Sequence, residues 1–422
     1  MIPLARPAVT VTALPHPGGI KLQFTACNRR IKTFTHIIPD RAHINAVREV
    51  LDERLTMLKD VVPDLSTELT DFSTVSARLM EMGRYLVYEL FGARRDVIEE
   101  LRTFWRSAIP TWRNPTVTPL IHCHGDEASM LPLEVLPMFR MGDFDVSSRL
   151  DFVARCRAFV GFSCIVSRSL LPLQPSAGGL LRRDSDGRAP IRYMHHEGLR
   201  GAKTELDWLL SGAASNVTVE GPYPGSGLGE PTVAAQIFDP CLLLGGGRRD
   251  LPDQIQHFSC HCYTRMNEPP RKYEIQLRGG GRDVRVTLGE IGIELIRLAD
   301  DAAEEPELSH RCAELPLVVM NACGTSVLTA TCSVSFPALF MKRGNRGFIG
   351  TEVAIPDDVA AVFSRSLYEG LFLQAQPVGA AVHQARRHLL ERYGNPLGIA
   401  YSVYGDSDLM VERHVDTGMR NT

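Results

Sequence analysis

The sequence of 422 residues has little net charge, and this excludes one broad class of function. Its 46 Lys and Arg residues nearly balance 49 Asp and Glu residues, which leaves a formal charge of −3. A chain of this kind has no basic field to hold a nucleic-acid backbone, so we expect no DNA or RNA partner. We also find no phosphate-binding loop of the G-x-x-x-x-G-K-[ST] form and no tandem repeat of the kind that builds sensor modules.

Long hydrophobic runs are missing as well. The longest, such as residues 315–320, are far shorter than the roughly 20 apolar residues that cross a bilayer. The N-terminus lacks the positively charged and then apolar layout of a secretory signal. We therefore expect a cytoplasmic protein without a membrane partner.

The ten cysteines are scattered rather than arranged as a disulfide framework, which in a cytoplasmic protein indicates free thiols. His and Cys side chains gather at residues 122–124 and 257–262. Neither stretch holds a C-x-x-C pair matched by a second pair at zinc-like spacing, and adjacent side chains on a strand point to opposite faces. We expect neither a metal nor another cofactor; a zinc-dependent hydrolase built on these clusters is the third-ranked hypothesis.

Apolar spacing divides the chain into two regions. Residues 1–110 are predicted to hold a small β unit, at 8–12, 20–25 and 32–38, followed by helices with apolar residues at helical spacing. In residues 111–422, short apolar runs bounded by Gly and Pro alternate with helical segments. This pattern is typical of an α/β fold with a mostly parallel central sheet and helices on both faces.

The strands expected in the second region are 117–123, 158–166, 191–195, 216–220, 254–260, 315–321, 347–350 and 399–404. The helices expected there are 203–211, 233–238, 334–342, 357–373 and 378–393. Residues 174–189 and 221–231 are rich in Gly, Pro and Ser and are predicted to be surface loops.

Two of the predicted strands end near reactive side chains, His261 and Cys323. The carboxyl ends of parallel strands line the crevice where ligands bind, so we expect these two side chains to meet there. An imidazole takes up the proton of a thiol to give a thiolate nucleophile, and it later protonates a leaving amine. The pair is the minimum equipment for peptide-bond cleavage through a thioacyl intermediate. The alternative for Cys323 is an inert buried cysteine.

Six segments carry a family resemblance. Residues 130–137 read Met-Leu-Pro-Leu-Glu-Val-Leu-Pro, 257–262 read His-Phe-Ser-Cys-His-Cys and 317–325 read Leu-Val-Val-Met-Asn-Ala-Cys-Gly-Thr. Residues 345–358 read Asn-Arg-Gly-Phe-Ile-Gly-Thr-Glu-Val-Ala-Ile-Pro-Asp-Asp, followed by Ala-Ala-Val-His-Gln-Ala-Arg at 380–386 and Tyr-Ser-Val-Tyr-Gly-Asp at 401–406. In this order, over about residues 75–411, they resemble the CHAT family of caspase-like cysteine peptidases, related more distantly to separase and caspases.

The resemblance implies a caspase-like fold and a catalytic dyad of His261 and Cys323. His257, four residues earlier, is expected to pack in or near the core. The family has Gly after the catalytic His, whereas this chain has Cys262. Its backbone N–H, together with that of Cys323, is expected to bind the oxyanion, while its side chain crowds the site. An oxidative pairing of Cys262 with Cys323 is a further alternative.

Substrate specificity is less defined. In caspase relatives the residue two before the catalytic Cys lines the S1 pocket; here it is Asn321, whose amide selects neither an acidic nor a basic P1 residue. Glu352, Asp357 and Asp358 would make the pocket acidic and favour Arg or Lys. The alternative for Asp357 is a capping role at the helix that follows.

The preferred interpretation is a cysteine endopeptidase that cuts a specific protein substrate. The resemblance implies an effector in a prokaryotic defence or regulated-cell-death system, with a gasdermin-like pore former as one substrate. An upstream sensor or activator protein is the expected trigger, and residues 1–110 are its expected docking surface. The second hypothesis is a caspase-like scaffold that hydrolyses nothing, which Cys262 in place of Gly favours.

Overall fold

The computed structural model describes residues 6–62, 64–65, 71–110, 118–138, 146–170, 179–211, 213, 215–224, 236–237, 239–243, 249–263, 272–304, 315–322 and 335–413. Cys323 lies outside these residues, as does most of the helix expected at 233–238.

A 13-stranded sheet organises this part of the chain. Its strands are β1 (Val9–His16), β2 (Gly19–Ala26), β3 (Phe34–Ile38), β4 (Leu120–His124), β5 (Ile165–Ser169), β7 (Ala189–His195), β8 (Val217–Tyr223), β9 (Ile255–Tyr263), β10 (Glu274–Gly279), β11 (Arg282–Thr287), β12 (Leu317–Ala322), β13 (Gly347–Thr351) and β14 (Tyr401–Gly405). The order is β11-β10-β9-β12-β13-β14-β5-β4-β1-β2-β3, and β7 joins β8 and β9. A separate two-stranded sheet pairs β6 (Leu180–Leu181) with β15 (Met410–Val411).

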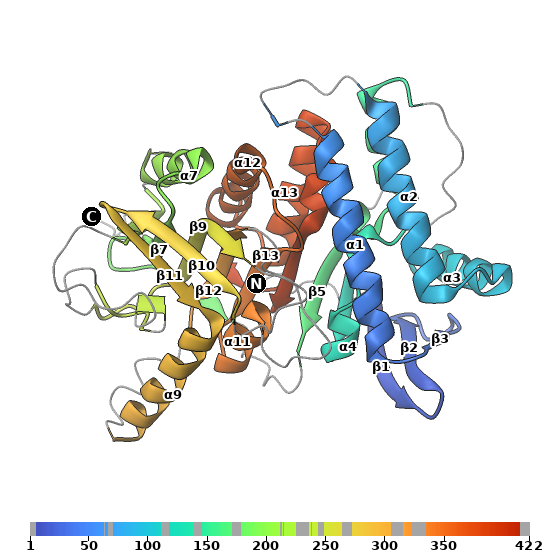
Figure 1. Ribbon diagram of the computed structural model, residues 1–422, viewed down its shortest axis with the longest axis horizontal. Helices are drawn as coiled ribbons and strands as arrows, with labels where there is room; N and C mark the ends of the chain where they lie inside the picture. The colour runs from blue at the N-terminus through green and yellow to red at the C-terminus, as the bar shows by residue number, and fades with distance from the viewer. Residues whose placement is uncertain are drawn as a thin grey trace, which may run out of the picture.

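The main helices are α1 (Arg41–Val61), α2 (Phe72–Phe91), α3 (Arg95–Ala108), α5 (Arg149–Cys156), α7 (Arg200–Ser211), α9 (Leu288–Glu304), α11 (Phe336–Arg343), α12 (Asp357–Tyr368) and α13 (Val378–Tyr393). Shorter helical turns are α4 (Asp126–Ser129), η1 (Leu133–Val135), α6 (Val160–Ser163), η3 (Glu369–Leu373) and η4 (Pro396–Ala400). In Figure 1, α1 to α3 lie with β1 to β3 at one end of the molecule, and α7 and α9 lie at the other. No helix in the described segments is long and apolar enough to cross a membrane.

The central strands are mostly parallel, as predicted. β7, β9, β12 and β13 pair in parallel, and so do β1, β4, β5 and β14, while β14 runs antiparallel to β13. Helices cover both faces: Asn321 of β12 donates a hydrogen bond to a carbonyl of α12, whereas Phe258 and Phe348 pack against Phe340 of α11. The predicted fold class is confirmed.

The N-terminal strands are part of the same sheet. β1 pairs in parallel with β4, from Val9 opposite Ile121 to Thr12 opposite His124. The sheet therefore continues across residue 110, and the division of the chain into 1–110 and 111–422 stays a prediction.

Local sequence explains where α11 begins and ends. The side chain of Ser335 accepts a hydrogen bond from the backbone N–H of Ala338, which satisfies one of the free donors of the first turn. Gly344 ends the helix in the left-handed conformation, with φ of 102°, which a residue without Cβ adopts at no steric cost. The helix expected at 334–342 is confirmed over its described residues.

The strand expected at 158–166 is only partly right. Residues Val160–Ser163 form the turn α6, and the strand β5 begins at Ile165. A short apolar run does not by itself distinguish a buried strand from a buried helical turn. Here the backbone N–H of Val160 donates to the carbonyl of Leu136, so this run packs against the segment at 133–137 before entering the sheet.

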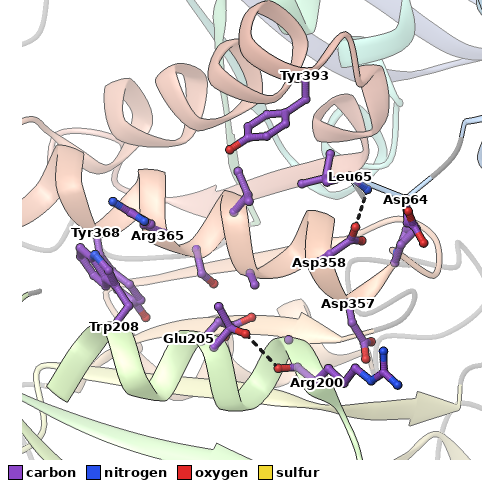
Figure 2. A pocket seen from close by; sticks show the side chains of 16 residues that line it. Asp64, Leu65, Arg200, Glu205, Trp208, Asp357, Asp358, Arg365, Tyr368 and Tyr393 are labelled. Atoms are coloured by element: carbon purple, nitrogen blue, oxygen red, sulfur yellow. Dashed lines mark hydrogen bonds between the residues drawn. The ribbon is translucent and has the colours of Figure 1, made fainter. Parts of the chain in front are cut away.

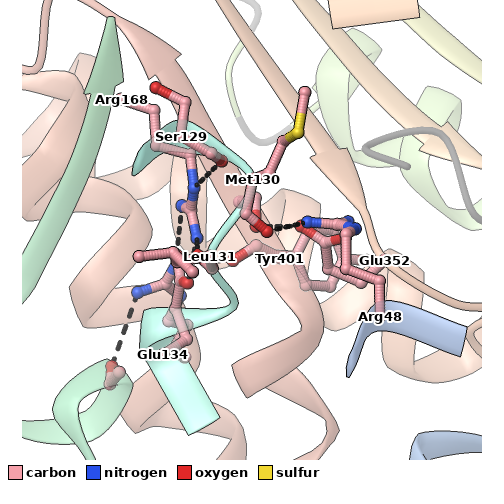
Figure 3. A network of polar contacts seen from close by, with 11 residues as sticks. Arg48, Ser129, Met130, Leu131, Glu134, Arg168, Glu352 and Tyr401 are labelled. Carbon is pink, nitrogen blue, oxygen red and sulfur yellow. Dashed lines mark hydrogen bonds and ion pairs between the residues drawn. The ribbon is translucent and has the colours of Figure 1, made fainter. Parts of the chain in front are cut away.

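Two buried arginines hold that segment through one carboxylate (Figure 3). Arg168 of β5 donates to both carboxylate oxygens of Glu134 and to the carbonyls of Ser129 and Leu131. Arg386 of α13 donates to the same carboxylate at 3.1 Å. All three ionic side chains are at most 4% exposed. The segment that resembles the family's leucine-proline motif is therefore fixed to the sheet and to α13.

A third arginine connects the N-terminal helices to the other end of the chain. Arg48 of α1 is buried, donates to the carbonyl of Met130 and forms an ion pair with Glu352, which follows β13 (Figure 3). Ser402 donates to the second oxygen of Glu352 at 2.6 Å. Residues 1–110 thus contact the segment that leads into α12.

Candidate active site

The two strands that carry the predicted dyad are direct neighbours. β9 and β12 pair in parallel and in register, from Leu317 opposite Ile255 to Ala322 opposite Cys260. In the sequence, His261 directly follows Cys260 of β9, and Cys323 directly follows Ala322 of β12. Both strands run toward the same edge of the sheet, which is where parallel sheets bind ligands.

His261 is half-buried and lies inside β9, which continues to Tyr263. Its backbone pairs with Gln276 of β10, so the expectation that the strand ends in a turn at this histidine is wrong. Its ring meets that of His196 edge to face, with centroids 4.6 Å apart. Burial, and secondarily His261 itself, lower the pKa of His196. Burial and the neighbouring imidazole therefore disfavour the charged form of His196 beside the histidine of the predicted dyad.

A small cavity of about 30 Å³ adjoins these strand ends. Ser259, His261 and Asn321 of the sheet line it, together with Glu205 of α7 and Asp357 of α12. A space of this size holds no more than a water molecule or two.

A larger pocket of about 640 Å³ lies between α7 and α12 (Figure 2). Trp208 and Tyr368 lie at one end, with their rings stacked and the ring centroids 6.5 Å apart. Asp357 and Asp358 lie at the other end, near Arg200. The pocket shares Asp357 with the small cavity, along with two residues of α7, so the two spaces are separated only by the contact between these helices.

Gly201 makes this contact. A Cβ at position 201 would overlap the backbone carbonyl of Asp357, so α7 and α12 meet here backbone to backbone. We expect Gly201→Ala to lower the free energy of unfolding by about 1–3 kcal/mol, because the two helices must move apart. The matched control is Gly292→Ala on α9, where a Cβ meets no atom within 4 Å and the change favours the helix. Equal melting temperatures for the two variants would contradict this packing.

The amide of Asn321 is completely engaged. Its nitrogen donates to a carboxylate oxygen of Glu205 at 2.7 Å, to the carbonyl of Ala360 at 3.0 Å and to the hydroxyl of Ser364 at 3.0 Å. Its oxygen accepts a hydrogen bond from Tyr401 at 2.6 Å. Asn321 borders the small cavity as a fixed wall, and its role in substrate selection stays a prediction.

The three acidic residues expected near the pocket have different surroundings. Glu352 is neutralised by Arg48, and Asp358 accepts a hydrogen bond from the backbone N–H of Leu65. Asp357 lines both cavities and makes no hydrogen bond or ion pair to any residue within the described segments. Of the three, Asp357 is the carboxylate available to a ligand.

The alternative role of Asp357 as a helix cap is wrong. Pro356 occupies the N-cap position of α12, and the side chain that accepts from a backbone N–H of the first turn is that of Asp358, which bonds the N–H of Val359 at 2.8 Å. Asp357 lies in the first helical turn, where its negative charge favours the positive end of the helix dipole.

Cys262 is paired with Ile275 of β10, and its side chain is 5% exposed. Because side chains alternate along a strand, its thiol points to the face opposite to that of His261. The seven cysteines within the described segments are free of disulfides, while the pairing of Cys262 with Cys323 falls outside them. In the same segments no group of three or more His, Cys, Asp or Glu side chains is arranged to hold a metal ion.

Comparison with known proteins places part of the chain in a family. The model of the CHAT domain family matches residues 249–396. This segment is similar to CHAT domains. It contains β9, β12 and α12, three of the elements that line the small cavity, as well as the positions of both residues of the predicted dyad. The resemblance read from the sequence motifs is confirmed.

Individual proteins that this chain resembles are distant. A probable protease of Vitiosangium sp. is 32% identical over 104 residues, which are 24% of this chain and 14% of that protein. Among solved structures, the Arg-specific cysteine proteinase gingipain R is 11% identical, with a TM-score of 0.43, over 76% of this chain and 69% of that one. Separase of Saccharomyces cerevisiae, in its complex with securin, is 11% identical with a TM-score of 0.43, over 96% of this chain and 30% of that one.

The sequence motifs did not point to Glu205, which lines the small cavity from outside the segment that matches the CHAT family. A signal was present in the sequence. The buried residues of α7 are Gly201, Ala202, Glu205 and Leu209, so a carboxylate occupies a position of the helix where an apolar residue is usual.

Proposed function

We propose that this chain is a cysteine endopeptidase that cleaves a specific protein substrate with His261 and Cys323. The observation that carries the proposal is the register of the neighbouring parallel strands β9 and β12, in which Ala322 lies opposite Cys260. His261 directly follows Cys260, and Cys323 directly follows Ala322. The CHAT match over residues 249–396 and the relative named as a probable protease support the same reaction class.

The chemistry follows from the two side chains. His261 accepts the proton of the Cys323 thiol, and the thiolate attacks the carbonyl carbon of the scissile peptide bond. The resulting tetrahedral intermediate collapses to a thioester when the C–N bond breaks, and the imidazolium of His261 gives its proton to the leaving amine. A water molecule, deprotonated by His261, then hydrolyses the thioester and releases Cys323. Backbone N–H groups of Cys262 and Cys323 are the proposed oxyanion donors.

Asp357 supports a preference for Arg or Lys at P1, because it is the carboxylate at the cavity that is not engaged by another described side chain. In the proposed pocket, Asn321 forms a polar wall. Glu352 belongs to the proposed pocket as the start of the segment that leads to α12. The small cavity must widen to admit a side chain, and α7 and α12 are the elements whose separation would open it toward the larger pocket.

The proposed biological role is that of an effector in prokaryotic defence or regulated cell death, acting in the cytoplasm on a gasdermin-like pore former or another protein. The proposed trigger is an upstream sensor or activator that binds residues 1–110. Two contacts support such coupling, since Arg48 and Leu65 of this region bind Glu352 and Asp358, on either side of Asp357. A non-catalytic scaffold is the second candidate, favoured by the buried Cys262 where the family has Gly.

Co-expression tests the proposal. The wild-type chain and its Cys323→Ala variant are each expressed with the products of neighbouring genes, and the intact mass of each partner is measured. A single cleavage that appears only with the wild-type chain is expected, and the masses of the fragments give the P1 residue. Identical cleavage by both chains would refute the peptidase assignment.

A further inference from the structure

A buried carboxylate beneath the strand ends has no role in the chemistry above. Glu205 of α7 is 4% exposed, although a carboxylate is costly to bury unless its oxygens are engaged. Both of its oxygens are engaged, and each contacts a different strand of the proposed active site.

One oxygen of Glu205 contacts the ring nitrogen Nε2 of His257 on β9 at 2.6 Å. The other accepts a hydrogen bond from Asn321 on β12 at 2.7 Å. His257 precedes His261 by four residues, and Asn321 precedes Cys323 by two. Because side chains alternate along a strand, His257, Ser259 and His261 share one face of β9. The carboxylate therefore joins the two strands on the face that carries the dyad histidine.

The partners of Glu205 are themselves held in place. The other nitrogen of His257 contacts the hydroxyl of Tyr368 at 2.7 Å, and its ring stacks on that of Tyr193, with centroids 5.1 Å apart. The hydroxyl of Tyr193 donates a hydrogen bond to the backbone carbonyl of Ala202 at 2.6 Å. Ala202 belongs to α7, the helix that also carries Glu205. The five residues named here are all buried, so solvent does not compete for these contacts.

We propose that Glu205 is a positioning residue, which holds the carboxyl-terminal ends of β9 and β12 in place against α7 and thereby sets how His261 faces Cys323. This inference rests on the proposed peptidase function and adds to it a residue outside the matched CHAT segment. Glu205 touches neither the proposed nucleophile nor its base. It acts through the length of its side chain, which is sufficient to contact both strands from one helix.

The length of the side chain and its charge are separable by two variants. Glu205→Asp keeps the charge and is one methylene shorter, so its carboxylate cannot keep both contacts. Glu205→Gln keeps the length, and its amide still accepts from Asn321 and contacts His257. A misplacement of about 1 Å at a reacting pair costs about 100-fold in rate. We expect kcat to fall about 100-fold in Glu205→Asp and less than about tenfold in Glu205→Gln, with little change in KM.

The matched controls are Glu369→Asp and Glu369→Gln. Glu369, the first residue of η3, forms a partly exposed ion pair with Arg365 and lines neither cavity itself, although Arg365 lines the larger pocket. Both control variants are expected to keep the kcat of the wild-type chain. The kinetics are measured on the substrate identified by co-expression, below the melting temperature of each variant, so that a smaller folded fraction does not count as a lower kcat. If Glu205→Asp does not fold, His257→Gln removes one of the two contacts and takes its place.

The outcomes separate this inference from the proposed function. A loss of kcat in Glu205→Asp that is much larger than in Glu205→Gln supports positioning. A loss in Glu205→Gln as large as that in Glu205→Asp, or larger, would show that the length of the side chain alone does not set kcat. An unchanged kcat with a lower melting temperature would show a merely structural role. Either result overturns the inference while Cys323-dependent cleavage stands. Equal cleavage by wild-type and Cys323→Ala chains would overturn both.

Discussion

Cys323→Ala and His261→Ala are each expected to lower kcat by about ten-thousandfold or more on the cognate substrate. Without the thiol no acyl-enzyme forms, and without the imidazole the thiol stays mostly protonated and the leaving amine receives no proton. Residues that act as one unit are not additive, so the double variant is expected to lose no more than either single variant. The measurement is the initial rate of substrate cleavage under saturating conditions.

The matched control for this prediction is Cys27→Ala. Cys27 is an exposed free cysteine that follows β2, at the N-terminal end of the molecule. Its loss is expected to leave kcat unchanged. Two results would contradict the dyad: a Cys323→Ala variant that keeps wild-type kcat, or losses in the single variants that multiply in the double variant.

Glu134→Gln is expected to lower the free energy of unfolding by about 3–5 kcal/mol. The carboxylate of Glu134 faces Arg168 and Arg386, and none of the three side chains is more than 4% exposed. A neutral amide leaves two buried guanidinium groups without their counter-charge, and burial makes such charges costly. Denaturant unfolding measures the change, with Glu99→Gln as control, since the ion pair of Glu99 with Arg102 on α3 lies at the surface, where water and salt screen it.

The same carboxylate predicts a dependence of stability on pH. Burial by itself raises the pKa of Glu134, but the charges of Arg168 and Arg386 and the hydrogen bonds from Arg168 more than offset this, and the pKa in the folded chain lies below its ordinary value. Its contribution is therefore fully present above the ordinary pKa of a glutamate and is lost as pH falls through the lower, folded value. Between these two pKa values, the wild-type chain should lose stability with acid, and Glu134→Gln should lose less. Parallel pH profiles would contradict this assignment.

The fold was largely predictable because its central strands are buried on both faces. The apolar runs at 254–260, 315–321 and 347–350 read as strands, and β9, β12 and β13 lie there. The hairpin of β10 and β11 was missed, although Gly280 and Gly281 between the two strands both have positive φ, which suits a two-residue hairpin turn. Each strand is six residues long and holds only two alternating apolar residues, Ile275 and Leu277 in β10 and Val284 and Val286 in β11, which is a weak signal beside the long apolar runs of the central strands.

The candidate site was predictable only where it lies in motifs. His261 and Asn321 lie near the ends of two strands, and the apolar runs in the sequence predict where these strands end. The network of Glu205, His257 and Tyr368 joins residues more than 50 positions apart, and nothing local in the sequence indicates such contacts. The same holds for Glu352, which the sequence suggested as part of an acidic pocket: its neutralising partner Arg48 comes from 304 residues earlier in the chain.

The most direct test of the dyad is the alkylation rate of each cysteine by iodoacetamide near pH 7, followed by mass spectrometry in the wild-type and His261→Ala chains. Cys323 is expected to react fastest in the wild-type chain and to lose that advantage without His261, because the imidazole stabilises its thiolate. Two cysteines calibrate the scale: exposed Cys27, and Cys123, whose pKa burial raises to about 12. A Cys323 that reacts no faster than Cys27, or equally fast with and without His261, would contradict the proposed active site.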